Sequence, residues 1–159
     1  MGASLAGSWV HHKGGVFHET QSSDCLLVAV GATAVYAQST AITQRKEAMK
    51  AIGGAIKEPG GMAKGEVAFD LAKVHAFLKV CQEQSPKAKT LFPDDSKDGD
   101  TKALPVIWEK KADFLGRFDK LAADCKAAEA AIKDEATFKA EWPKVGGNCG
   151  GCHKEYRKS

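Results

Sequence analysis

The sequence lacks the features that mark several large protein classes. Its 23 basic side chains are spread along the chain without a long run, which argues against a nucleic-acid-binding surface. Its main uncharged run, residues 25–37, is far shorter than the roughly 20 apolar residues that a membrane-spanning helix needs. It has no internal repeat, no low-complexity tract and no convincing strand pattern. These absences leave a chain of 159 residues that is long enough to bury one core.

The uncharged run near the start, CLLVAVGATAVYA, resembles the end of a secretory signal. Val35 and Ala37 stand three and one positions before a suitable cleavage point. The segment before the run is an unusual start for a signal, because it is long and carries Glu19 and Asp24. We predict that residues 1–37 are a signal peptide with its upstream segment, removed on export. Residues 38–159 then form the mature domain, in the periplasm.

Alternating periodic segments and breakers predict four helices in that domain. The first begins near Thr40 and ends at the breakers EPGG, residues 58–61, after which a further turn can follow. The second begins at Asp70, a good helix cap, and weakens at residues 85–86, Ser-Pro. After a polar connection comes the third helix, and the fourth begins at a second cap, Asp134.

Apolar stripes on these helices predict how they pack. The stripe of the second helix consists of Leu71, Val74, Leu78 and Cys81. The third helix places Trp108, Leu115 and Ala122, together with Phe118 and Cys125, at heptad-like positions. Amphipathic helices without strands predict an all-α fold, an antiparallel four-helix bundle.

The motif CGGCH, residues 149–153, carries the chemistry of the chain. Cys149 and Cys152 are three residues apart and His153 follows at once, so one helix presents all of them on one face. Arg157, four residues after His153, shares that face. Two thiols so placed can bond to the vinyl edge of a haem while the imidazole reaches its iron. We therefore predict a covalent haem on the last helix.

Two haem-free alternatives use the same cysteines. A structural zinc site needs four ligands, and besides the motif the mature chain offers Cys81, Cys125 and His75 without a second close-spaced pair. We expect His75 at the rim or the surface. A thioredoxin-like CxxC would sit at a strand-to-helix junction, and no strand is expected. A zinc protein or a thiol protein therefore remains an alternative that the sequence favours less than a covalent haem protein.

The two spare cysteines are expected to be buried thiols that act as small apolar residues. Cys81 is late in the second helix and Cys125 is about twenty residues into the antiparallel third helix. Helix geometry then separates them by roughly 25 to 30 Å. A disulfide needs α-carbons within about 7 Å, so we expect none.

With this motif near the carboxyl end and four helices before it, the sequence resembles the class II c-type cytochromes. These include cytochrome c′ and its low-spin, methionine-ligated relatives. The segments that carry the resemblance are RKEAMKAIGGAIK, LFPDDSKDGDTKALPVIW and CGGCHKEYR. The resemblance implies one haem c held by Cys149 and Cys152, with His153 as the proximal iron ligand. Arg157 would lie close to that imidazole and raise the reduction potential, or else be a solvated terminal charge.

The resemblance also points to Met49, which stands four residues after Arg45. In this family that position faces the distal side of the haem. A ligating methionine there implies a non-enzymatic periplasmic carrier of single electrons, with periplasmic redox proteins as partners and a homodimer as a further assembly. The alternative is a five-coordinate cytochrome c′ that binds nitric oxide or carbon monoxide opposite His153. Arg45 is a candidate partner of a haem propionate, or an exposed helix charge.

Overall fold

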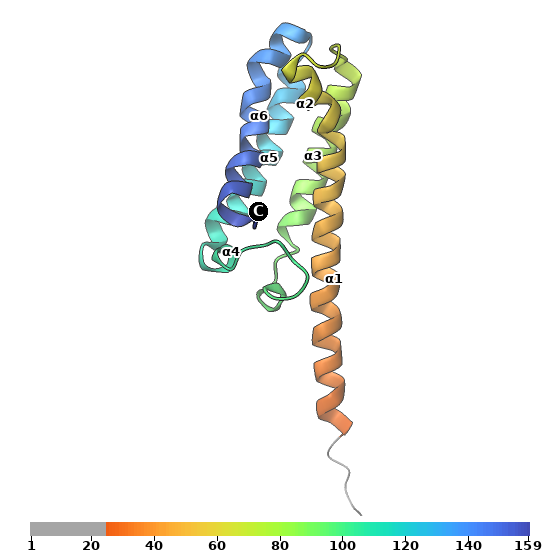
Figure 1. Cartoon of the computed structure of the whole chain (residues 1–159), viewed down its shortest axis with the longest axis vertical. Helices are drawn as coiled ribbons and strands as arrows, with labels where there is room; N and C mark the ends of the chain where they lie inside the picture. Colours follow the sequence, from red (N-terminus) through yellow and green to blue (C-terminus); the bar gives the residue numbers. More distant parts are fainter. Residues whose placement is uncertain (1–24) are drawn as a thin grey trace, which may run out of the picture.

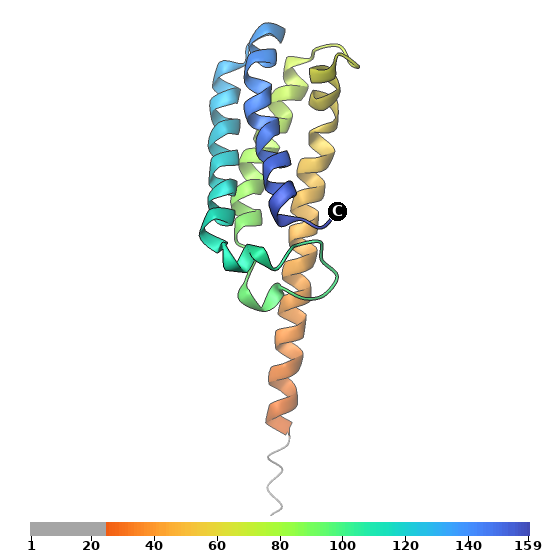
Figure 2. The ribbon, with the colours of Figure 1, turned by 60° about the vertical axis from the view of Figure 1, so that its left-hand side comes forward.

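The computed structural model describes residues 25–159, which fold into helices packed side by side (Figure 1). The four long helices are α1 (Cys25–Ala55), α3 (Leu71–Lys89), α5 (Lys111–Ala131) and α6 (Glu135–Tyr156). Shorter elements join them: α2 (Lys57–Lys64), the 3-10 turn η1 (Asp94–Ser96) and α4 (Val106–Glu109). Successive long helices run in opposite directions in both views (Figures 1 and 2), so the predicted all-helical bundle is confirmed.

Helix α1 begins earlier than the sequence predicted. Its first residue is Cys25, not a position near Thr40, because the uncharged run before Thr40 contains no proline and continues directly into the helix. The early part of α1 extends beyond the other helices (Figures 1 and 2). The predicted signal segment, residues 1–37, lies partly outside the described residues, so its removal stays a prediction. Within residues 25–159, no helix is long and apolar enough to cross a membrane.

The break after α1 falls at Ile56, two residues before the predicted breakers. Pro59 is the third residue of α2, where a missing N–H leaves no helical hydrogen bond unmade. The helix then ends at Gly65, whose φ of 74° is the left-handed conformation that glycine adopts without strain. Residues 58–61, predicted to end a helix, therefore lie inside the short helix α2.

Both predicted caps are present. The Asp70 carboxylate accepts the N–H of Lys73 at 3.2 Å and begins α3. The Asp134 carboxylate accepts the N–H of Thr137 at 2.8 Å, while the Thr137 hydroxyl accepts the N–H of Asp134 at 3.0 Å. This capping box fixes the start of α6, the helix that carries the CGGCH motif.

One prediction follows from this cap. Hydrogen bonds from Thr137 lower the pKa of Asp134, so the cap is strongest above the ordinary carboxyl pKa and is lost as pH falls through the lowered value. Asp134→Ala should lower the melting temperature at pH 7 by about 4 °C, whereas Asp134→Asn, which keeps an acceptor, should lower it less. In thermal scans from pH 6 to pH 2, the gap between the native chain and Asp134→Ala should close. A gap that stays constant to pH 2 would contradict this role.

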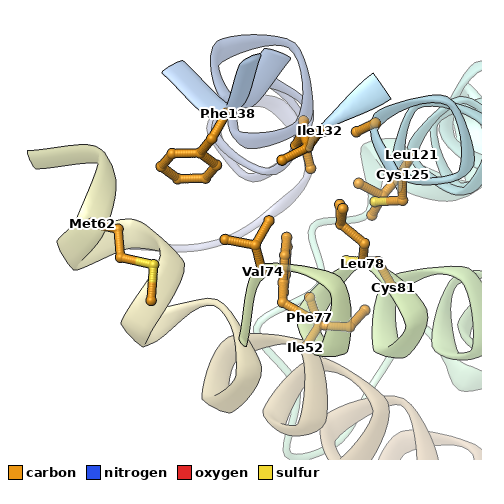
Figure 3. Packing of buried hydrophobic residues seen from close by; sticks show 12 residues of the cluster. Ile52, Met62, Val74, Phe77, Leu78, Cys81, Leu121, Cys125, Ile132 and Phe138 are labelled. Atoms are coloured by element: carbon orange, nitrogen blue, oxygen red, sulfur yellow. The ribbon is translucent and has the colours of Figure 1, made fainter. Parts of the chain in front are cut away.

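The core between α3, α5 and α6 confirms part of the predicted stripes. Figure 3 shows Leu78 and Cys81 of α3 facing Leu121 and Cys125 of α5, and Val74 nearer to Phe138 of α6. Phe118 and Cys125 are buried as predicted, whereas Trp108, Leu115 and Ala122 are only partly buried, because the buried face of α5 consists of Phe114, Phe118, Leu121, Cys125 and Ala128. Trp108 belongs to α4, and the break at Lys110 separates its register from that of α5.

The two spare cysteines are buried, as predicted, but they are not far apart. Cys81 and Cys125 each have 0% exposure and belong to one core cluster, and the neighbouring Cys125 thiol is the main cause that raises the pKa of Cys81. The expected separation is wrong because both helix ends differ from the prediction. Helix α3 continues through Pro86 to Lys89, and α5 starts only at Lys111, so the two residues come to the same level of the bundle.

Candidate cofactor site

A cavity of about 890 Å³ opens between α1, α5 and the last turns of α6. Its volume is within the range of roughly 300–1,000 Å³ that is usual for small-molecule sites. All six predicted site residues line it: Arg45, Met49, Cys149, Cys152, His153 and Arg157. The fold therefore brings the two sequence segments that were singled out, one in α1 and the other at the end of α6, to a single cavity.

The CGGCH motif forms the α6 wall of the cavity. Cys149 and Cys152 are half-buried, and burial is the main cause that raises the pKa of both thiols. Desolvation by the cavity wall, and then the charge of Arg157, lower the pKa of His153. The imidazole is therefore neutral at pH 7, which is the form that ligates metals.

Arg157 reaches the site differently from the prediction. It does not share the helical face of His153, because α6 ends at Tyr156 and Arg157 has extended backbone. The N–H of Arg157 donates to the carbonyl of His153 at 3.2 Å, and the residue forms an isolated antiparallel bridge with Ala103. Its side chain still lines the cavity close enough to lower the pKa of His153.

Arg45 is buried, with 3% exposure, so the alternative of an exposed helix charge is wrong. Its guanidinium donates to the connection between α3 and α4. The acceptors are the Ser96 hydroxyl (3.0 Å), the Ser96 carbonyl (3.0 Å), the Thr101 hydroxyl (2.7 Å) and, more weakly, the Leu91 carbonyl (3.4 Å). The side chain thus fixes a segment about 50 residues further along the chain to the wall of the cavity.

The surroundings of Arg45 are neutral. The guanidinium lies 4.9 Å from the centre of the Phe92 ring and 5.9 Å from that of Trp108. No ion pair found among the described residues includes Arg45, and burial lowers its pKa. A buried cation surrounded by neutral groups is costly, and an anionic group brought close to it would be bound favourably.

Met49 lines the cavity from α1, whereas the motif lines it from α6. The core consists of two clusters of buried residues, one that includes Phe77 and Phe138 and one that includes Phe92 and Phe114. The methionine is half-buried and packs against both core clusters. One turn later, a side chain placed on Gly53 would meet no atom within 4 Å, so the cavity is open there. Met49 is thus positioned to contact a flat ligand in the cavity.

A network beside the motif was not predicted. Arg117 of α5 donates to Asp113 at 3.0 Å and to Glu155 at 2.6 Å, and its guanidinium lies 5.1 Å from the centre of the Tyr156 ring. The Tyr156 hydroxyl donates to Asp113 at 2.5 Å, and burial followed by this hydrogen bond raises the pKa of Tyr156 to about 12. The sequence contained one sign of this network, the i,i+4 spacing of Asp113 and Arg117. That spacing is common on solvent-exposed helices, so it does not by itself indicate a network.

The zinc alternative finds no ligand set. Among residues 25–159, no group of three or more histidine, cysteine, aspartate or glutamate side chains is arranged to hold a metal ion. His75 is half-buried, and its Nε2 lies 3.1 Å from the carbonyl of Ile132, at the connection between α5 and α6. It does not belong to the cavity wall.

Comparison with known proteins gives one family. The profile of cytochrome c′ matches residues 40–157. The chain is 48% identical over 132 residues to cytochrome c′ of Rhodopseudomonas palustris, covering 82% of this chain and 90% of that protein. It is 34% identical over 131 residues to cytochrome c-556 of the same organism, covering 79% and 88%.

Solved structures agree. Cytochrome c′ from Rhodopseudomonas palustris superposes with a TM-score of 0.72 at 48% identity, covering 75% of this chain and 96% of that one. A structural model of oxidised cytochrome c556 from the same organism gives a TM-score of 0.67 at 31% identity, covering 75% and 96%.

Proposed function

Because the chain belongs to the cytochrome c′ family of class II c-type cytochromes, whose members are non-enzymatic haem proteins, we propose that it holds one haem c in the cavity. Cys149 and Cys152 would form the thioether bonds, and His153 would be the proximal iron ligand. When bound, the haem supplies one-electron chemistry and an iron centre for small gases.

One observation carries this proposal: a single cavity joins the three residues of the motif to a buried cation without a counter-ion. Two half-buried thiols and a neutral imidazole stand on one wall. Arg45 on another wall is surrounded by neutral acceptors and aromatic rings. A haem propionate would supply the missing negative charge, and the apolar residues of the cavity would cover the ring.

Between the two functions drawn from the resemblance, we propose the five-coordinate cytochrome c′ that binds nitric oxide or carbon monoxide. The higher identity to cytochrome c′ than to cytochrome c-556, 48% against 34%, supports it. So does the packing of Met49, which contacts both core clusters as an ordinary apolar side chain would. The second candidate is the electron carrier with Met49 on the iron, which the place of Met49 in the cavity wall favours.

The proposed location is the periplasm, which is typical of the family. The family match begins at residue 40, so cleavage after Ala37 would leave the matched segment intact. The predicted partners, periplasmic redox proteins and a second copy of the chain, remain predictions.

Binding of carbon monoxide distinguishes the five-coordinate cytochrome c′ from the electron carrier with Met49 on the iron. Added to the reduced protein, carbon monoxide should change the haem absorption spectrum of the native chain at once, and Met49→Ala should alter its affinity by less than about threefold, below 1 kcal/mol. Met62→Ala is the matched control, since Met62 is a buried methionine outside the cavity. If the native chain does not respond and Met49→Ala does, Met49 is an iron ligand and the electron carrier is the correct function.

A further inference from the structure

We infer that Cys81 and Cys125 form a disulfide in the mature protein, which links α3 to α5. The inference depends on the proposed export to an oxidising compartment, where disulfides persist. It does not depend on the ligation of the iron.

The two cysteines lie together in the core. Cys81 and Cys125 belong to one core cluster, both at 0% exposure, and the Cys125 thiol is close enough to raise the pKa of Cys81. Figure 3 shows them in the space between α3 and α5, beside Leu78 and Leu121. A disulfide requires α-carbons within about 7 Å, which two neighbouring cysteines on packed helices can meet.

A third cysteine gives the pair a consequence for the proposed function. Cys149 of α6 packs against the same core cluster as Cys81 and Cys125. In an oxidising compartment, each spare thiol could pair with Cys149 and remove it from haem attachment. A bond between Cys81 and Cys125 leaves Cys149 and Cys152 as the two thiols that haem attachment needs.

The reaction is a thiol–disulfide exchange. The two S–H bonds of Cys81 and Cys125 break, one S–S bond forms, and two electrons and two protons pass to a disulfide oxidant, whose own S–S bond becomes two thiols. The hydrogen bond to Cys125, and then burial, raise the pKa of Cys81, so little thiolate exists in the folded core. The bond therefore forms while the chain is still folding, and the closed core then shields it from reductants.

Mass spectrometry tests the inference on holo-protein purified from a bacterial periplasm. The sample is denatured and alkylated without reductant, then digested with trypsin. Peptides 80–87 and 121–126 should remain joined until reduction, and each should then take one alkyl group. Alkylation of Cys81 and Cys125 before reduction, or a bond from either to Cys149, overturns the inference. An intact mass without haem would overturn the proposed function instead, so the two failures are distinct.

Unfolding gives a second measurement. A cross-link between residues 81 and 125 restricts the unfolded chain, so a reductant should lower the urea midpoint of the native chain by about 1–2 M. The double variant Cys81→Ala/Cys125→Ala should show the same midpoint with and without reductant, which makes it the matched control. Equal midpoints for the native chain under both conditions would also overturn the inference.

Discussion

Replacing Cys149 and Cys152 together by serine should abolish haem retention by the denatured chain. Both residues stand on the α6 wall of the cavity, and in the proposed function they supply the covalent bonds. Without them, any haem is held by contacts that denaturation destroys. Haem staining of a denaturing gel and intact mass should both detect no haem on the double variant, against full occupancy in the native chain.

The single variants and two distant cysteines complete this experiment. Cys149→Ser and Cys152→Ser should each keep one covalent bond and therefore remain stained. The double variant Cys81→Ala/Cys125→Ala, altered in the core outside the cavity, should also keep its haem, because it leaves no spare thiol that could pair with Cys149. Haem that remains on the denatured double variant would contradict the assignment of both thiols.

Arg45→Ala should cost about 3 kcal/mol of folding free energy, a large effect for one side chain. The change leaves the Ser96 carbonyl and the Ser96 and Thr101 hydroxyls without the donor that they share, and it removes the cation beside the Phe92 ring. Since Arg45 fixes the connection between α3 and α4, that connection should also become sensitive to proteases. The urea midpoint should fall by about 1–2 M.

Two controls separate this effect from a general loss of charge on α1. Lys50→Ala removes an exposed cation of the same helix and should change stability by less than about 0.5 kcal/mol. Arg45→Lys keeps the charge but not the planar fork that reaches both Ser96 and Thr101, so it should recover only part of the loss. An Arg45→Ala midpoint equal to that of Lys50→Ala would show that the hydrogen bonds contribute nothing.

The predictions that succeeded depend on neighbouring residues. The caps at Asp70 and Asp134 act within three positions, and the spacing of Cys149, Cys152 and His153 lies within two helical turns. Such features are local, so the sequence alone contains the distances that matter. The helical bundle follows from the same kind of information, since each apolar stripe requires a partner helix.

The predictions that failed depend on where distant segments meet. The acceptors of Arg45 lie 46 to 56 residues away along the chain, and no periodicity in the sequence indicates that they contact it. The contact of Cys81 with Cys125 depends on the helix ends at Lys89 and Lys111, and errors of a few residues there were enough to misplace both thiols. Arg157 was misplaced because the chain leaves the helix to pair with Ala103.

The segment after α6 affects when the cavity wall forms relative to the attachment of haem. The Leu104 N–H donates to the Tyr156 carbonyl at 3.0 Å, and the Lys158 N–H donates to the Lys102 carbonyl at 2.8 Å, so the last residues close against a connection that Arg45 ties to α1. Contacts of such large sequence separation form late, because the chain between them must first be ordered. Residues 102–104 and 156–158 must therefore meet before this wall exists, and any enzyme that joins haem to the thiols earlier would act on a chain whose pocket is still incomplete.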